Sequence, residues 1–317
     1  MRRILPAVLI AATALAAGAC GAPGSSSRTS APPQATSGAS QAGEHSLPAA
    51  PGKVTVGSAA FPESELLAHL YADAMKARGV AVQIHANIGE RAAYMSALKE
   101  GSIGAIPEYT GAILNYLSPR QKATSPQDIY AQLRRSAQPQ GLAVTDYAPA
   151  QDADTITVTK ATADKYHLSS IEDLQRVAGR LRLGAPQPLL TVPYGVPGLK
   201  KVYGVTFKQF VALAPTGTIT QTALRNGTVD AADIFSTDPA IPRYGFLSLK
   251  DPHHLFAAQN IVPLFKRDVL TQPMADACNA VSARLTTTAL SELDAQVAGG
   301  ADPDSVAQKW LSAHGLA

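Results

Sequence analysis

The chain contains one short pattern twice, and this repeat is the feature that most restricts how it can fold. Residues 97–110 read ALKEGSIGAIPEYT, and residues 223–236, which begin 126 positions later, read ALRNGTVDAADIFS. In each copy a helix-like segment ends in leucine and a basic residue, a glycine supplies a left-handed position, and a short apolar stretch follows. The pattern predicts helix, turn and strand in both copies, ending at the aromatic residues Tyr109 and Phe235.

Two further landmarks repeat at nearly the same spacing. VTVG at 54–57 is echoed by LRLG at 181–184, and RGV at 78–80 is echoed by YGV at 203–205. We therefore predict an α/β fold of two similar lobes, in which ligand-facing loops follow the carboxyl ends of the strands. The alternative is that the similarity arose by chance, because leucine before glycine is common at helix ends. Chance could explain one such match, but it explains three matches at nearly the same spacing less well.

The N-terminus has the pattern of a secretory signal. Two arginines precede an apolar stretch over 4–17, which is short for a transmembrane helix. Small residues then lead to Cys20 in a segment that resembles a bacterial lipoprotein box, although alanine stands where leucine is usual three positions before the cysteine. We expect a signal peptide over 1–19 and a lipid on Cys20. Ordinary cleavage that leaves Cys20 unmodified is the alternative.

Residues 20–52 are rich in serine, alanine, glycine and proline and hold hardly any large apolar side chain. Such a segment cannot bury enough surface to fold, so we predict a flexible tether. A lipid anchor with a tether would hold the folded part outside the cytoplasm, at the outer face of the cytoplasmic membrane.

Charge and cysteine content restrict the partners. Removing residues 1–19 takes away two arginines and no acidic residue, so the formal net charge falls from +3 to +1. A balance so close to neutral gives no reason to expect a nucleic-acid partner. If Cys20 carries lipid, Cys278 has no disulfide partner within the chain, and we expect it to be buried as a small apolar residue.

The lobe boundaries follow from where the chain crosses between the two repeats. We assign 53–153 together with 258–317 to the first lobe and 154–257 to the second. Residues 154–160 alternate threonine with isoleucine or valine, which is typical of a strand with one solvated face, and we place the first crossing there. The chain is expected to return through 260–265, so that two segments form a hinge.

Periodicity and capping residues predict the individual elements. The predicted strands cover 54–57, 82–86, 103–106, 206–213 and 229–234. The predicted helices cover 62–78, 90–100, 218–226 and a C-terminal segment that Asp302 caps and Pro303 opens. Within the second helix we interpret Tyr94 and Met95 as core residues rather than as site residues.

No sequence motif predicts catalysis, a metal or a cofactor. The chain has no phosphate loop, dinucleotide-binding glycine pattern, nucleophile elbow, HEXXH or CXXC. His253 and His254 beside Asp251 are weak metal candidates, because adjacent loop residues seldom converge on one ion, and a solvated turn is favoured. Glu108 as a general base has no partner that any motif supplies. Binding without chemistry is therefore the favoured interpretation.

Four segments together resemble one transport family: VGS at 56–58, ALKEGSIGAIPEYTG at 97–111, GLKKVYG at 198–204 and STD at 236–238. They are similar to the substrate-binding proteins of osmoprotectant ABC importers, which carry glycine betaine, choline or proline betaine. The resemblance implies a bilobal periplasmic-binding-protein fold of type II with a two-segment hinge. It also implies that a single chain closes on a small solute and delivers it to the transmembrane permease subunits.

The resemblance also implies site residues. Family members hold a quaternary ammonium in a cage of tyrosines and hold the ligand's carboxylate with basic side chains. Of the cage, only Tyr109 remains a tyrosine, Phe235 supplies a second ring, and Thr155 and Gln259 stand at the other two cage positions. The family's basic residues are replaced by Val192 and Ala59, and we add Thr110 and Leu190 to the predicted site.

These departures from the family pattern leave the identity of the solute undecided. Each lost ring removes roughly 0.5 to 2 kcal/mol of cation binding, and the lost charged pair removes roughly 1.5 to 3 kcal/mol. One hypothesis is that the chain serves a transporter of the osmoprotectant family. A second keeps the transport role but assigns a neutral, partly aromatic or polyhydroxylated solute. A third is a sensor domain without transport, and an enzyme on a binding-protein fold is the least favoured.

Overall fold

The computed structural model describes residues 46–213 and 217–317, and residues from Ser46 to Ala317 form one compact unit. The predicted signal peptide, Cys20 and the tether up to residue 45 lie outside the described residues. The last part of the predicted tether, 46–52, belongs to the compact unit. Leu47 packs against the first hydrophobic core, and the carbonyl oxygens of Pro48 and Pro51 accept hydrogen bonds from Gln272 and Thr271.

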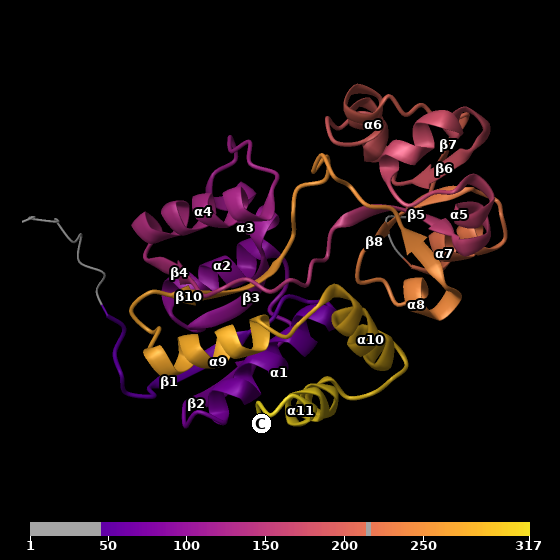
Figure 1. The fold of residues 1–317 in the computed structure, drawn as a ribbon. Coiled ribbons are helices and arrows are strands. Elements are labelled where there is room, and N and C mark those ends of the chain that lie inside the picture. The colour runs from indigo at the N-terminus through magenta and orange to yellow at the C-terminus, as the bar shows by residue number, and fades with distance from the viewer. Residues whose placement is uncertain (1–45, 214–216) are drawn as a thin grey trace, which may run out of the picture. The chain divides into compact units, whose positions relative to one another are not determined.

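The first sheet has five strands in the order β2-β1-β3-β10-β4 (Figure 1). Its strands are β1 (Lys53–Gly57), β2 (Ala81–His85), β3 (Ala105–Tyr109), β4 (Leu142–Val144) and β10 (Ile261–Lys266). Strand β1 pairs in parallel with β2 and β3, whereas β10 runs antiparallel to β3 and β4. The sheet is therefore mixed, and β10, which comes after the whole second sheet in the sequence, lies between β3 and β4.

The second sheet has the order β7-β6-β8-β5-β9. Its strands are β5 (Asp154–Thr159), β6 (Arg182–Ala185), β7 (Gln209–Ala212), β8 (Ala231–Phe235) and β9 (Phe246–Ser248). Strand β6 pairs in parallel with β7 and β8, whereas β5 runs antiparallel to β8 and β9. The position of β5 in this sheet corresponds to that of β10 in the first sheet.

The repeat seen in the sequence is confirmed by this topology, because both sheets have the same strand order and the same pairing directions. Gly101, with φ of 84°, and Gly227, with φ of 71°, occupy the left-handed position predicted after each helix. Strands β3 and β8 follow these glycines and end at Tyr109 and Phe235. The two predicted aromatic residues are therefore the last residues of equivalent strands.

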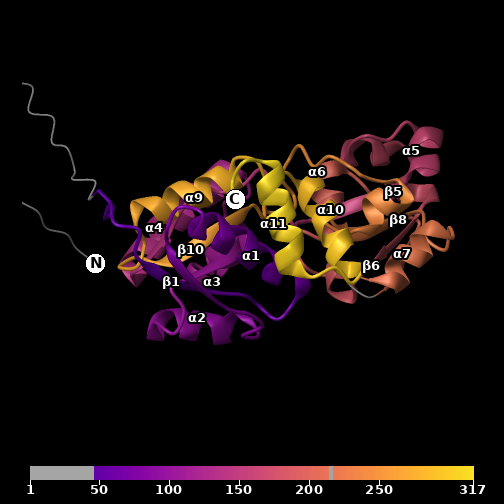
Figure 2. The ribbon, with the colours of Figure 1, turned by 90° about the horizontal axis from the view of Figure 1, so that it is seen from below.

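Helices cover the sheets, and the two predicted over 62–78 and 90–100 are confirmed with closely similar bounds. Those linking the strands of the first sheet are α1 (Pro62–Lys76), α2 (Arg91–Glu100), α3 (Thr110–Leu117), α4 (Pro126–Ala137) and the 3₁₀ turn η1 (Gln138–Gln140). Those after β10 are α9 (Gln272–Ser282), α10 (Thr287–Ala298) and α11 (Pro303–Ala313). Asp302 accepts a hydrogen bond from the Ser305 backbone, which confirms the predicted cap of the last helix. Helix α11 packs against α1 (Figure 2).

The second sheet is linked by shorter helices. They are α5 (Lys160–Tyr166), η2 (Ile171–Arg176), η3 (Ala178–Arg180), η4 (Gln187–Leu190), α6 (Val196–Tyr203), α7 (Thr218–Arg225) and α8 (Ala240–Tyr244). The segment from η4 to α6 is proline-rich and tightly folded. Its backbone passes so close to Gly195 that a Cβ there would lie 2.0 Å from the carbonyl oxygen of Leu189. It follows β6 and therefore lies at the carboxyl end of that strand.

The chain passes between the two sheets twice, after β4 and after β9. The two connecting segments pair with each other through an antiparallel bridge between Gln151 and Asn260. The strand predicted over 154–160 is confirmed as β5, which begins directly after the first connecting segment, but its predicted solvated face is wrong. Strand β5 is instead an interior strand of the second sheet, and Thr157 is fully buried between β8 and β9.

Core predictions agree with the structure. Tyr94 and Met95 are buried in a core of the first lobe together with Leu98. Cys278 is fully buried among apolar side chains, and Trp310 packs in the same core. Among the described residues, no helix is both long and apolar enough to cross a membrane.

Candidate functional site

Tyr109 is the last residue of β3, and both its hydroxyl and its ring make contacts that fix its position. Its hydroxyl donates a 2.5 Å hydrogen bond to Glu63 at the start of α1, and its ring stacks against Phe61 with 6.3 Å between ring centroids. Phe61 is 40% exposed, whereas the Tyr109 ring is partly buried against the first core. An aromatic surface is therefore available where β3 meets the loop before α1.

Glu108, the residue before Tyr109, forms an ion pair with Arg91, whose side chain is 32% exposed. Glu108 is 1% exposed and takes two hydrogen bonds from Arg91, at 2.9 and 3.1 Å, and one from the Tyr94 hydroxyl at 2.7 Å. Its second oxygen also accepts from the Tyr109 backbone N–H at 3.0 Å. A carboxylate with this many donors is a structural anchor that sets the position of Tyr109.

Acidic side chains surround the Tyr109 hydroxyl. Besides Glu63, Asp152 lies in the first connecting segment and Asp294 lies on α10. Burial first, and then the charge of Glu63, raise the pKa values of both aspartates. Burial, followed by the charges of Glu63 and Asp152, likewise raises the pKa of Tyr109. The surroundings of Tyr109 thus favour a positively charged group over a negatively charged one.

Phe235 is the equivalent aromatic residue in the second lobe. It lies opposite Asp154 in the antiparallel pair of β8 and β5, and Asp233 lies opposite Ile156. Because side chains alternate along a strand, Phe235, Asp154 and Asp233 share one face of the sheet. Phe235 is among the site residues predicted from the sequence, and the two carboxylates are not.

Thr155 lies on the opposite face from Phe235. Its hydroxyl contacts the Thr157 hydroxyl at 2.7 Å and donates to the Ile234 carbonyl oxygen at 2.6 Å. A shift of one residue moves a side chain to the other face of a strand. Of the two neighbours, Asp154 rather than Thr155 therefore accompanies Phe235.

Gln259 and Thr110 join the second connecting segment to the start of α3. The Gln259 amide oxygen accepts from the Ala112 backbone N–H at 2.9 Å, and the Thr110 hydroxyl accepts from the Asn260 N–H at 3.0 Å. The backbone at the start of α3 approaches the second connecting segment so closely that a Cβ on Gly111 would lie 2.6 Å from the Ala258 carbonyl oxygen. Both side chains thus have structural partners next to Tyr109.

The remaining predicted residues do not gather around the two rings by any contact that the structure shows. Val192 and Leu190 are half-buried in the proline-rich segment after β6. Ala59 is 7% exposed and packs in a core of the first lobe, and its N–H donates to the Ser64 hydroxyl.

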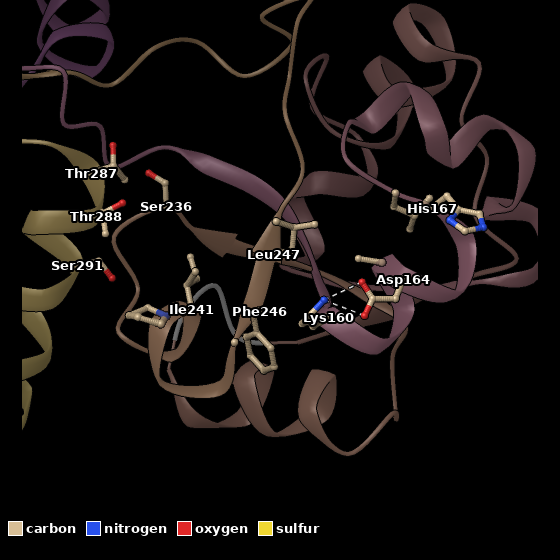
Figure 3. A pocket seen from close by; sticks show the side chains of 14 residues that line it. Lys160, Asp164, His167, Ser236, Ile241, Phe246, Leu247, Thr287, Thr288 and Ser291 are labelled. Atoms are coloured by element: carbon tan, nitrogen blue, oxygen red, sulfur yellow. Dashed lines mark hydrogen bonds and ion pairs between the residues drawn. The ribbon is translucent and has the colours of Figure 1, made fainter.

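One hollow in the described part of the chain has a volume of about 560 Å³. Figure 3 shows Lys160 bonded to Asp164 at one side of it and Thr287, Thr288 and Ser291 of α10 at the other. A second hollow, of about 240 Å³, is lined by Asp154 and Thr155. Of the eight predicted site residues, Thr155 alone lines either of these two hollows.

Two groups of residues resemble metal ligands in composition. His69 and Asp73 on α1 lie close to Asp304 on α11, and the His69 Nδ1 is 2.9 Å from an Asp304 oxygen. Lys76 already bonds Asp73 at 2.8 Å, which makes the group a connection between two helices. Asp251 accepts from the Leu255 and Phe256 N–H groups, so the region around His253 and His254 is a hydrogen-bonded turn.

A sequence signal for the missed carboxylates does exist. Asp233 interrupts the buried strand AADIF, where a charged residue is unusual, and Asp154 opens β5. Without the strand register, neither could be assigned to the face that carries Phe235.

Comparison with known proteins identifies relatives over nearly the whole described chain. The family model for the substrate binding domain of ABC-type glycine betaine transport systems matches residues 52–313. The glycine betaine-binding protein YehZ of Escherichia coli (strain K12) is 27% identical over 276 residues, which is 83% of this chain and 90% of YehZ. The carnitine transport binding protein OpuCC of Listeria monocytogenes is 24% identical, over 81% of this chain and 85% of its own.

Solved structures share the fold. A glycine betaine/carnitine/choline ABC transporter structure superimposes with a TM-score of 0.77 at 22% identity, covering 83% of this chain and 99% of the other. Apo YehZ from Escherichia coli superimposes with a TM-score of 0.74 at 26% identity, covering 84% and 99%. Two mixed sheets with helices are therefore the type II periplasmic binding protein fold.

Proposed function

Since the chain belongs to the family of substrate-binding domains of ABC-type glycine betaine transport systems, we propose that it captures a small solute between its two lobes and delivers it to a permease. Tyr109 and Phe235 contact the solute from the first and second lobes. The lobes close on it, and the solute stabilises the closed state because it contacts both lobes only there. A single chain performs this step outside the cytoplasm.

One observation carries this assignment of the site. Tyr109 and Phe235 end equivalent strands of two sheets with the same topology, at the carboxyl ends where α/β sheets place ligands. A solute that lies between them meets one ring from each lobe. Ring faces attract cations, and they also pack against apolar parts of a ligand.

Replacing Tyr109 by alanine is expected to weaken solute binding by at least tenfold, because it removes one of the two rings. Tyr109→Phe keeps the ring and should retain most of the affinity. Titration calorimetry with glycine betaine, choline and ethanolamine measures both variants against the unmodified protein. Tyr116→Ala, a change at a 41% exposed ring on α3, is the control. Unchanged affinity in Tyr109→Ala would contradict the assigned site.

We place the protein at the outer face of the cytoplasmic membrane, anchored by a lipid on Cys20. Cys20→Ser is expected to move most of the protein from the membrane fraction to the soluble extracytoplasmic fraction, because one acyl group or none binds a membrane only weakly. Fractionation followed by immunoblotting measures this. Cys278→Ala changes the other cysteine, which is buried, and should leave the protein at the membrane. Equal partitioning of both variants would exclude the anchor.

A further inference from the structure

Asp233 is a buried carboxylate without a partner. It is 1% exposed, and neither of its side-chain oxygens has a hydrogen-bond partner among the described residues. Burying a carboxylate without hydrogen bonds is strongly unfavourable, so buried acids are normally paired. In a protein that binds a solute, an unsatisfied acid near the site indicates that the solute supplies the missing donors.

The position of Asp233 connects it to the proposed site. It lies two residues before Phe235 on the same face of β8, and Asp154 lies across from Phe235 on β5. Asp154 also lines the hollow of about 240 Å³ beside the strand. The ring and the two carboxylates therefore form one continuous group at the end of the second sheet.

No positive charge from the strands of this sheet balances the two acids. The only basic residue within these five strands is Arg182, and it is bonded to Asp230 at 2.9 Å, before the start of β8. Lys160, which follows β5, is exposed and bonds Asp164. In the proline-rich segment after β6, the nearby titratable group is Tyr194. Burial, then the charges of Asp154 and Asp233, raise its pKa.

We propose that Asp154 and Asp233, beside the ring of Phe235, bind the cationic end of a small amine that keeps at least one N–H. This deepens the proposed function and rests on it, because it specifies the solute. Carboxylates form strong charge-assisted hydrogen bonds with N–H donors of an ammonium group. A quaternary ammonium has no N–H and would leave the Asp233 oxygens unsatisfied.

The residues around Tyr109, in the first lobe, also favour a ligand that is positively charged and carries no carboxylate of its own. The Tyr109 hydroxyl donates to Glu63, and the charges of Glu63, Asp152 and Asp294 all raise its pKa after burial does. In the same lobe Ala59 stands where the resemblance places a basic residue, so this position supplies no positive charge for a ligand carboxylate. An amino alcohol or a similar amine fits these charges better than a betaine, and better than the neutral solute suggested by the missing tyrosines.

Proton release provides an independent measurement. Burial first, and then the charge of Asp154, raise the pKa of Asp233 to about 8, so at pH 7 its carboxyl is mostly protonated. A bound ammonium stabilises the ionised form, and the proton leaves to the solvent. Amine affinity should therefore rise with pH up to about 8. Calorimetry in two buffers of different ionisation enthalpy should show proton release on binding.

The test uses four amines that carry the same charge and differ in N–H number: ethanolamine, N-methylethanolamine, N,N-dimethylethanolamine and choline. Titration calorimetry with the full-length protein at pH 7.5 should show affinity falling along this series. Ethanolamine should bind at least tenfold more tightly than choline. Binding of choline as tightly as ethanolamine would overturn the proposal, and so would the absence of binding by all four.

Variants assign the effect to the carboxylates. Asp233→Asn and Asp154→Asn should each weaken ethanolamine binding at least tenfold and bring it close to that of choline. Asp164→Asn removes one exposed carboxylate from the same lobe and should change nothing. If choline or glycine betaine binds tightly, needs Tyr109 and is unaffected by Asp233→Asn, the solute-binding function stands and the amine subsite is excluded.

Discussion

Arg91→Met is expected to destabilise the protein by about 3 to 5 kcal/mol, because it leaves the buried carboxylate of Glu108 without its charged partner. For a chain of this size each kcal/mol shifts the melting temperature by about 2 to 4 °C, so the midpoint should fall by about 6 to 20 °C. Differential scanning calorimetry of the ligand-free protein measures it.

A second variant separates the ion pair from simple loss of packing. Arg91→Met combined with Glu108→Gln removes both charges, and it should recover a large part of the lost stability, since replacing a whole buried pair costs far less than breaking it. Arg176→Met breaks an exposed ion pair and should change stability by less than about 1 kcal/mol. If the double variant were no more stable than the single one, the charge argument would fail.

Asp233→Asn is expected to stabilise the ligand-free protein at pH 8 by several kcal/mol and to have much less effect at pH 5. The folded-state pKa of Asp233 is raised from 3.8 to about 8, by burial first and then by Asp154. A raised pKa favours folding while the group is protonated, and this contribution is lost as pH rises from about 4 to about 8. A tenfold difference in proton affinity between the folded and unfolded states corresponds to about 1.4 kcal/mol of stability, and asparagine does not ionise.

Denaturant unfolding at pH 5, 6.5 and 8 measures this difference. The other buried acids, Asp152 and Asp294, are present in both proteins, so their pH dependence cancels in the comparison. Asp164→Asn should show the same pH dependence as the unmodified protein, because that carboxylate is exposed. A stability difference between Asp233→Asn and the unmodified protein that stays constant across pH would contradict a buried, unpaired Asp233.

Much of the fold could be predicted because it depends on local signals. Glycine after a helix, proline at its first turn and an aspartate cap mark boundaries through short-range hydrogen bonds and sterics, and Gly101, Pro62 and Asp302 act as predicted. The repeat added the long-range information, since two copies of one pattern imply two similar sheets.

The site was harder to predict because it depends on strand register. Periodicity identified β5 but not which of its faces meets Phe235. The family resemblance named Thr155 as a site residue, and the pairing of β5 with β8 puts its neighbour Asp154 on the face of Phe235. The buried environment of Asp233 depends on side chains from distant parts of the chain. The ion pair of Glu108 with Arg91 likewise joins residues from two different elements. No local pattern contains that information.

The measurement that tests the central claim most directly is a thermal-shift screen of the full-length protein at pH 7.5. The panel holds glycine betaine, carnitine, the four amines from ethanolamine to choline, and neutral aromatic and polyol compounds. A solute that binds only the folded state raises the melting midpoint by mass action. We predict saturable shifts with a small solute, largest with ethanolamine, that disappear in the Tyr109→Ala, Phe235→Ala double variant. No shift with any compound, or shifts that survive in the double variant, would contradict a solute-binding protein with its site at these two rings.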